Sequence, residues 1–299
     1  MILLIRYRFH KISKNIIPDI NSKKMKRILV PVDFSVYSEN AFKSALKMAE
    51  KSNASITCLN VVNSTIDWNN LSPKAKARHQ DILDSEAEAK DKLQSFIKDH
   101  KTNETPVEAV VEVGIPAAQI LEIAGRQNAD LIVIGAYGIG HEPGKFIGST
   151  LQTVMRKANC PVLGVKKTVN GNDLKKITFA SLFSEESKPA FGRIKPIIKS
   201  IGSSVHFLYI NSPHTFSTSE KMEKLMLDFK SGQEDLTIHQ HIYNHDEVEN
   251  GIIAFSEGKK TGIIAIVAKQ RRMAAYHTGV TETVLFKSDI PVLSVKMEE

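Results

Sequence analysis

Glycines, a serine and a threonine gather in one stretch that follows an apolar run. The stretch is "GAYGIGHEPGKFIGST", residues 135–150, with the spacing Gly135-x-x-Gly138-x9-Gly148-Ser149. Glycines at 135 and 138 would let the backbone approach a pyrophosphate and adopt positive φ angles. A helix beginning at 148–150 would offer free N–H groups, the positive end of its dipole and the Ser149 and Thr150 hydroxyls. The spacing indicates a phosphate site; the other interpretation is a flexible connection before a helix that Ser149 caps.

A carboxylate stands at the end of an earlier apolar run, "RILVPVDFS". Asp33 ends this predicted strand, and Gly135 ends the later run "LIVIG". In an open parallel sheet, ligands bind beyond the carboxyl ends of the strands, where the strand order reverses. A carboxylate there can accept hydrogen bonds from two ribose hydroxyls or help to hold Mg²⁺. The alternative role of Asp33 is to cap the first helix near Ser35.

Several common catalytic and nucleotide signatures are missing from the chain. Gly144-Lys145-Phe146 is not a Walker GK[ST] sequence and Gly138-x-Gly140 is not GxGxxG, so neither a P-loop NTPase nor a Rossmann dehydrogenase is indicated. The sequence contains no GxSxG, no HExxH and no carboxylate pair with a partner base. No catalytic residue is therefore predicted, and we expect any ATP hydrolysis to be slow.

Three histidines lie close together in "TIHQHIYNHD", residues 237–246. His239 and His241 share one face of a predicted strand by its period of two, and His245 follows at a turn. A zinc site needs three or four converging ligands, and this pattern places two of them. The two interpretations are a metal site and a solvated histidine pair on an edge strand.

Short runs rich in Val, Ile and Leu alternate with longer helical patterns. Ser35 is the predicted cap of a helix that ends near Ser52, and Pro116 opens another helix. Near-continuous apolar runs predict strands covered on both faces, as in a parallel sheet. The βαβ order with right-handed crossovers predicts a doubly wound α/β sandwich. In the first half the predicted strands are 27–33, 55–62, 107–113, 130–135 and 161–166.

The second half of the chain repeats the first. "KRILVPVDFS" (26–35) aligns with "KKITFASLFS" (175–184), and "CPVLGVKK" (160–167) aligns with "IPVLSVKM" (290–297). The matching segments keep their order, which indicates a tandem duplication joined at "KTVNGND", residues 167–173. The sequence therefore predicts two tandem five-stranded domains. The predicted parts are a basic, disordered tail (1–24), an N-terminal domain (25–168) and a C-terminal domain (174–299).

The positive net charge of +7 comes from the N-terminal tail. Eight of the 40 Lys and Arg residues but one of the 33 Asp and Glu residues lie in residues 1–27, so 32 of each sign remain. This balance argues against a basic groove for nucleic acid on the folded body. A loose tail is the main interpretation of the basic segment, and a membrane-surface helix with Ile12, Ile16 and Ile17 is the alternative.

Nothing in the sequence indicates a membrane span or a disulfide. No apolar run approaches the roughly 20 residues that a span needs. Cys58 and Cys160 stand in apolar surroundings without CxxC spacing, which fits free buried thiols in a reducing compartment. We therefore expect a cytoplasmic protein.

Three of these features together resemble the universal stress protein (UspA) family in its tandem form. They are "KRILVPVDFS", the spacing from Gly135 to Ser149 and the closing "CPVLGVKK", and the resemblance covers about residues 25–297. The glycine spacing with its serine is similar to that of the family's ATP-binding branch. The resemblance implies a Rossmann-like fold of the adenine nucleotide alpha hydrolase type in each half, and ATP as ligand, with or without Mg²⁺.

The resemblance also assigns roles to individual residues. It implies that Asp33 holds the ribose, with Pro31 and Val32 near the base. Val61, at the end of the second strand, would line the adenine pocket. His141 and Lys145 would approach the phosphates from their loop, or stay solvated. The residues that it places around the phosphates are Gly135, Ala136, Tyr137, Gly138, Gly148, Ser149 and Thr150.

The second half departs from this pattern at each position that could bind nucleotide. Val267 would bring a branched Cβ to a place where the backbone meets phosphate, while Gly279 with Thr281 still resembles the helix start. We therefore expect one nucleotide site, in the N-terminal domain, and a degenerate, structural or sensing second domain. The aligned pairs are Asp33 with Leu182, Gly135 with Val267 and Gly138 with Gln270.

The expected function is that of an ATP-binding regulatory protein of the stress response. The alternatives are an interaction module of the same fold that binds no nucleotide, and a slow ATPase. The expected partner is an adenine nucleotide and not a nucleic acid. We expect the two domains to pair within the chain as single-domain relatives do in dimers, and further homodimerisation stays open.

Overall fold

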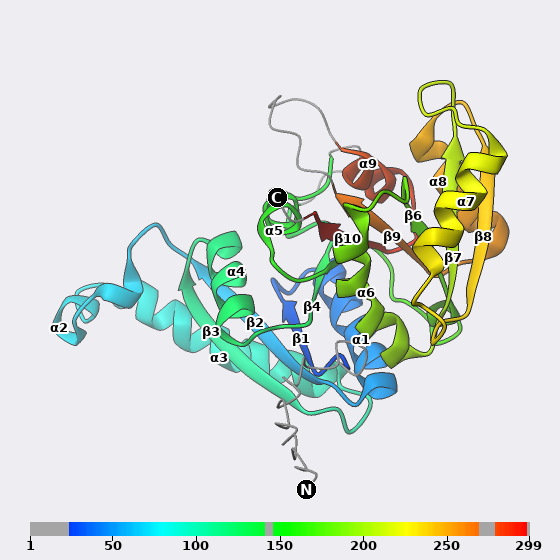
Figure 1. Ribbon diagram of the computed structural model, residues 1–299. Helices are drawn as coiled ribbons and strands as arrows, with labels where there is room; N and C mark the ends of the chain where they lie inside the picture. The colour runs from blue at the N-terminus through cyan, green and yellow to red at the C-terminus, as the bar shows by residue number, and fades with distance from the viewer. Residues whose placement is uncertain (1–23, 141–145, 269–278, 298–299) are drawn as a thin grey trace, which may run out of the picture.

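The described part of the chain forms one ten-stranded sheet with helices on both faces (Figure 1). The computed structural model describes residues 24–140, 146–268 and 279–297. The predicted α/β fold, with two doubly wound five-stranded halves, is confirmed. The strands are β1 (Arg27–Pro31), β2 (Ser55–Asn63), β3 (Val107–Gly114), β4 (Leu131–Gly135), β5 (Val162–Val165), β6 (Lys176–Ala180), β7 (Ser204–Asn211), β8 (Ile238–Asn244), β9 (Ile263–Ala268) and β10 (Val292–Lys296).

The order of the strands determines where a ligand site can lie. The order is β3-β2-β1-β4-β5-β10-β9-β6-β7-β8. In the first half, β1 lies between β2 and β4 and runs parallel to both. The chain therefore winds in opposite directions from the β1–β4 pair, which is the switch point of this half. The second half repeats the arrangement with β6 between β7 and β9.

The two halves are joined by β5 and β10, which pair antiparallel. Their register opposes Gly164 to Val292. Because all other pairs are parallel, the strands of the two halves run in opposite directions. The carboxyl ends of the first five strands and of the last five therefore point to opposite sides of the molecule, along the strand direction. Arg156 supports the joint by donating two hydrogen bonds to Glu282, at 3.0 and 2.8 Å. The halves thus pair within one chain.

Helices cover both faces of the sheet. The buried apolar residues of α1, α3, α6 and α7 form one core with the sheet, and those of α4, α5, α8 and α9 form another on the opposite face. Both cores extend across the joint. The helices are α1 (Val36–Ser52), α2 (Pro73–Lys76), α3 (Gln80–His100), α4 (Pro116–Arg126), α5 (Ser149–Lys157), α6 (Ser187–Ile201), α7 (Ser219–Lys230), α8 (Val248–Lys259) and α9 (Val280–Lys287), with 3₁₀ turns η2 (Trp68–Asn70) and η3 (Asp173–Lys175).

Local sequence signals set the ends of several helices. Ser35 caps α1 by accepting a hydrogen bond from the Ser38 N–H, and Pro116 is the first residue of α4. Both agree with the sequence analysis. The segment between β2 and α3 was not predicted: it contains η2 and α2 and projects from the body (Figure 1), with Trp68 buried at its base.

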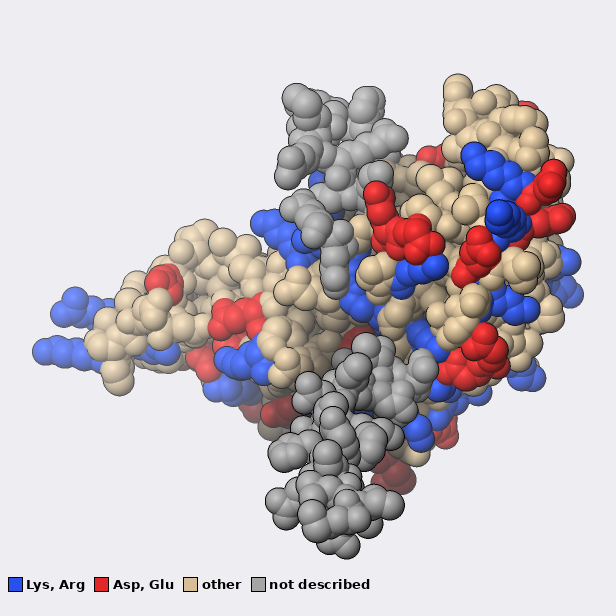
Figure 2. All heavy atoms as spheres, viewed as in Figure 1, with Lys and Arg blue, Asp and Glu red and all other residues tan. Residues whose placement is uncertain are grey.

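The surface charge is mixed on the face shown in Figure 2, and the two thiols are free. Lys and Arg are interspersed with Asp and Glu over the face shown in Figure 2, as the balanced charge outside the tail predicts. Burial raises the pKa of the free thiols of Cys58 and Cys160, to about 12 and about 11, so both stay protonated.

None of the helices in the described ranges combines the length and the apolar character that crossing a membrane requires. The predicted tail lies outside the described residues except for Lys24.

Candidate functional site

Asp33 links the two stretches that the sequence analysis places in one site. It follows β1, and its Oδ1 accepts hydrogen bonds from the N–H (3.1 Å) and the hydroxyl (2.6 Å) of Ser35. Its Oδ2 accepts a hydrogen bond from the N–H of Ile139 at 3.1 Å, in the loop after β4. Phe34 adopts the left-handed conformation (φ 64°) that turns the chain from β1 into the α1 cap. Asp33 therefore supports the cap and also faces the glycine loop, and its oxygens keep lone pairs for further donors.

Gly135 and Gly138 are glycines because their surroundings are crowded. A Cβ at Gly138 would lie 2.8 Å from Asp33 Oδ2, and a Cβ at Gly135 would lie 2.8 Å from the carbonyl carbon of Tyr37. Neither glycine has a positive φ, whereas Gly140 does (φ 78°). The positive φ that the sequence analysis expected at these two glycines is therefore wrong. They permit the close approach of Asp33 to the loop and of α1 to β4.

The start of α5 packs against the same loop. Gly148 donates its N–H to the carbonyl of Ala136 at 3.0 Å and is the N-cap residue, so the interpretation that Ser149 caps this helix is wrong. Gln152 is the residue whose N–H bonds to the Gly148 carbonyl. The N–H groups of Ser149 and Thr150 thus precede the helical ladder, at the positive end of the helix dipole. Ser149 is exposed and Thr150 is half-buried.

Buried strand ends form the floor beside Asp33. Pro31 and Val32 are buried. The Val32 N–H donates to the Leu59 carbonyl at 2.7 Å, and the Val32 carbonyl accepts a hydrogen bond from the side-chain amide of Asn60 at 2.7 Å. Both backbone groups of Val32 are therefore already bonded, which fixes the floor in place. Val61 follows on β2, half-buried against the core under α4.

Tyr137 follows β4 and lies near the joint, next to Tyr37 and Lys166. Ala136 before it is fully buried. The Tyr137 ring packs edge-to-face against Tyr37 with 5.0 Å between ring centroids, and the Lys166 ammonium lies 5.8 Å from the Tyr137 centroid. Burial raises the pKa of the Tyr137 hydroxyl, and Tyr37 and Asp289 raise it further, so this hydroxyl stays protonated.

The residues brought together offer hydrogen-bond donors and one carboxylate. Among the predicted site residues that the structure describes, Asp33 is the one carboxylate, and none is Lys, Arg or His. Such a set can accept hydrogen bonds from ligand hydroxyls at Asp33 and bind an anion at the α5 start. It includes no base that could activate water other than Asp33 itself. His141 and Lys145, named in the sequence analysis, lie outside the described residues.

In the second half, a carboxylate of the protein occupies the matching helix start. Glu282 Oε2 accepts a hydrogen bond from the N–H of Gly279, the N-cap residue of α9, at 2.7 Å. The same side chain accepts the two bonds from Arg156. When Gly279 is aligned with Gly148, the residue that matches Glu282 in α5 is Leu151, which is buried in the core. The α9 start is therefore neutralised by a carboxylate of its own helix, whereas α5 carries an apolar residue at the matching position.

The turn from β6 into α6 keeps the shape of the turn from β1 into α1 but not its polar residue. Phe183 repeats the left-handed conformation of Phe34, with φ 54°. Leu182 stands where the first half has Asp33, and its side chain is 62% exposed. Gln270, the counterpart of Gly138, lies outside the described residues.

Asn60, Tyr37 and Glu282 were missed by the sequence analysis. Asn60 was detectable, because it is an amide inside the apolar run "ITCLNVV" and a buried amide needs a partner. Glu282 was detectable in part, because a Glu three residues after a helix N-cap has the spacing of a capping box. The contacts of Tyr37 with Tyr137 and of Glu282 with Arg156 depend on elements that are distant along the chain.

The β8 histidines pack with a third histidine from β7. The His206 ring stacks on His239 and His241, with centroid distances of 5.0 and 5.1 Å, and His206 Nδ1 lies 2.9 Å from His241 Nε2. His245 is not part of this histidine stack; its Nδ1 accepts the N–H of Glu247. Across the described ranges, no three His, Cys, Asp or Glu side chains are arranged to hold a metal ion. The structure thus adds the buried His206 to the two β8 histidines.

Acid is expected to weaken the fold through the histidine stack. Burial, with repulsion from His241, His239, Lys176 and Lys259, lowers the pKa of His206 to about 4, and burial also lowers the pKa of His241. The unfolded chain takes up protons below about pH 6.5 that folded His206 does not take up until about pH 4. The stabilisation that neutral His206 provides is therefore fully present above about pH 6.5. As the pH falls from about 6.5 to about 4 this stabilisation is lost, and the free energy of unfolding falls by at most on the order of 3 kcal/mol.

Urea unfolding at about pH 7.5 and about pH 5 measures this loss. In His206→Phe the difference between the two pH values should shrink, because the titrating group is gone and an aromatic ring still fills the stack. His214→Gln is the control, since His214 is exposed. Equal losses in the unaltered chain and both variants would show that the stack does not set the acid sensitivity.

Comparison with known proteins connects these features to one family. The universal stress protein family profile matches residues 24–166. Universal stress protein MJ0531 of Methanocaldococcus jannaschii is 29% identical over 150 residues, which cover 48% of this chain and 82% of the relative. A protein of Staphylococcus aureus (strain USA300) that is assigned to the universal stress proteins is 30% identical over 148 residues, which cover 47% of this chain and 84% of the relative.

Solved structures agree with the architecture. The crystal structure of a universal stress protein from Archaeoglobus fulgidus matches with a TM-score of 0.70 at 18% identity, covering 92% of this chain and 99% of that chain. This match shows the fold over 92% of the chain. A universal stress protein in complex with cAMP covers 48% of this chain and 98% of its own at 21% identity, and its TM-score of 0.35 is too low to bear on the ligand.

Proposed function

The chain belongs to the universal stress protein family, and from this membership we propose that it is an ATP-binding regulatory protein of the stress response in the cytoplasm. It comprises two tandem domains, 25–168 and 174–299, with one nucleotide site in the first. One observation carries the proposal: Asp33, Gly138 and the start of α5 converge at the switch point of the first half. A carboxylate and a helix N-terminus so placed suit the two polar ends of a nucleotide.

Each part of the site has a definite task in this proposal. Asp33 accepts the ribose hydroxyls, and the floor formed by Pro31, Val32 and Val61 faces the adenine. The phosphates lie over the glycine loop and the α5 start, where Gly148, Ser149 and Thr150 offer N–H groups and hydroxyls. Mg²⁺ bound with the nucleotide would neutralise phosphate charge that the predicted site residues do not. Asp33 is the one base of the site among the described residues, so we expect ATP to act as a ligand that changes the state of the protein.

We expect the purified chain to bind one ATP. The second half is excluded because Glu282 already neutralises the α9 start and Leu182 replaces the ribose carboxylate. Isothermal titration gives the stoichiometry, and mass spectrometry identifies any nucleotide carried through purification. Incubation of the complex with Mg²⁺ then shows whether ATP persists, as expected of a ligand, or is turned over.

Matched variants assign the site to one half. Asp33→Ala should lose affinity, while Leu182→Ala at the aligned position should bind ATP as the unaltered chain does. Two equivalent sites would contradict the degenerate second half. A folded chain that binds no ATP would identify an interaction module of this fold instead.

A further inference from the structure

The β8 strand leaves one edge of the sheet open. It is the last strand in the order, and within the described ranges β7 is its one strand neighbour. The Val205 N–H donates to the Thr237 carbonyl, and the His245 N–H donates to the Asn211 carbonyl. In a parallel ladder the backbone groups of every second residue point toward a given neighbouring strand. The odd-numbered residues of β8 therefore bond to β7. The backbone N–H and carbonyl groups of Gln240 and Ile242 therefore face outward; we call this row the β8 edge.

The β8 edge lacks the features that keep sheet edges unpaired. Its seven residues, "IHQHIYN", include no Pro, Lys, Arg, Asp or Glu. The opposite edge, β3, carries Glu108 and Glu112, and Glu112 forms an ion pair with Arg126 at 3.0 Å. Charged residues and proline on edge strands prevent the addition of a further strand. The chain thus protects β3 and leaves β8 able to accept a strand.

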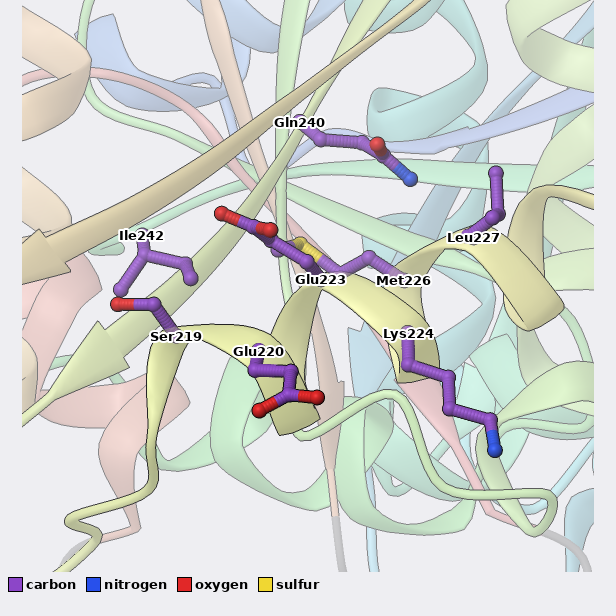
Figure 3. A pocket seen from close by; sticks show the side chains of 8 residues that line it. All are labelled: Ser219, Glu220, Glu223, Lys224, Met226, Leu227, Gln240 and Ile242. Atoms are coloured by element: carbon purple, nitrogen blue, oxygen red, sulfur yellow. The ribbon is translucent and has the colours of Figure 1, made fainter.

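A groove with acidic and apolar walls lies on one side of the β8 edge. This α7 groove, of about 620 Å³, lies between α7 and β8 and is lined by Met226, Leu227 and Ile242 together with Glu220 and Glu223. Figure 3 shows Glu223 extending toward Ile242, whereas Lys224 extends away from it. Leu227 is 62% exposed. The groove therefore suits side chains that are apolar or positively charged.

A second groove, of opposite character, lies on the other side of the same strand. This α8 groove, of about 410 Å³, is lined by Tyr243 and Phe255, with His241 and Lys259 beside them. Tyr243 and Phe255 pack together with 5.8 Å between ring centroids. No described carboxylate forms an ion pair with Lys259. The α8 groove therefore suits aromatic or acidic side chains.

We propose that the β8 edge binds an extended peptide segment of a partner protein by strand addition. Successive side chains of an added strand point to opposite faces. One row, apolar and basic, enters the α7 groove, and the other, aromatic and acidic, enters the α8 groove, while the backbone bonds to Gln240 and Ile242. A second copy fits less well, since antiparallel pairing of two β8 strands sets like faces side by side and brings Lys259 toward its own copy.

A synthetic peptide with this alternation tests the proposal on the full chain. The blocked peptide LEKFLEK has leucines and lysines in one row and glutamates and phenylalanine in the other. Its isomer LEFKLKE has the same composition but mixes the charges within a row. Fluorescence anisotropy should show LEKFLEK binding at least tenfold more tightly than the isomer. Equal binding of the two peptides would overturn the proposal.

Variants of the chain locate the binding. Gln240→Pro removes an outward N–H and leaves the β7 ladder intact, so LEKFLEK should bind at least tenfold more weakly. Glu223→Lys reverses a charge in the α7 groove without touching the backbone and should weaken binding likewise. Glu108→Lys, on the β3 edge, is the matched control and should have no effect. Sedimentation that shows a dimer of the unaltered chain lost in Gln240→Pro would assign the edge to a second copy and overturn the proposal.

Discussion

The Gly138→Gln variant is expected to bind ATP about five- to 150-fold more weakly than the unaltered chain, a loss of roughly 1–3 kcal/mol. A Cβ at this position would lie 2.8 Å from Asp33 Oδ2, an atom that also accepts the Ile139 N–H. The carboxylate or the loop must move, and the glutamine side chain then extends into the proposed phosphate space. Calorimetric titration with ATP measures the change.

Two further variants show the cause of this loss. Gly138→Ala introduces the Cβ alone and should account for part of the loss. Gly125→Ala, in α4, places a Cβ in open space and should leave the affinity unchanged. Circular dichroism reports whether each variant is folded. If folded Gly138→Gln binds ATP with unchanged affinity, the phosphates do not lie over this loop.

The Gly262→Ala variant is expected to lose about 3 kcal/mol or more of unfolding free energy. A Cβ at Gly262 would lie 1.9 Å from the carbonyl oxygen of Asp173 and 2.4 Å from its carbonyl carbon, both backbone atoms. Gly262 also donates its N–H to the Lys176 carbonyl at 3.1 Å, so β9 cannot retreat without losing that bond. Because Asp173 ends the segment between the two halves, relief of the clash would disturb their connection.

Thermal unfolding measures this effect, and the melting temperature should fall by roughly 5 °C or more. Gly192→Ala is the matched control: its Cβ would lie in open space on α6, and alanine favours a helix, so its stability should rise by up to about 1 kcal/mol. A Gly262→Ala chain that melts within about 2 °C of the unaltered chain would mean that the contact with Asp173 relaxes easily.

The strands and the switch point could be predicted because their signals are local. "LIVIG" became β4, in which all five residues are buried, as an apolar run covered on both faces requires. Ser35 and Pro116 begin or cap helices where their side-chain chemistry indicates. Once the strands were known, the rule for open sheets brought Asp33 and Gly135 to one end of neighbouring strands.

Contacts between distant segments could not be predicted in the same way. Position 138 requires a small residue because Asp33, far away in the sequence, packs against it, whereas the sequence suggested a positive φ and a close approach to phosphate. His206 meets the β8 histidines through strand register, and Glu282 meets Arg156 across the joint between the two halves. The projecting segment with α2 has too few residues to show a helical period.

Dilution should not separate the two halves, because β5 and β10 belong to the same chain. If the same antiparallel joint linked two separate chains with micromolar affinity, most of them would be unpaired at nanomolar concentration. A short connection instead holds the two strands at an effective concentration on the order of millimolar. The ten-stranded sheet is therefore complete even in a cell that contains few copies, and the abundance of the protein can vary without changing its assembly.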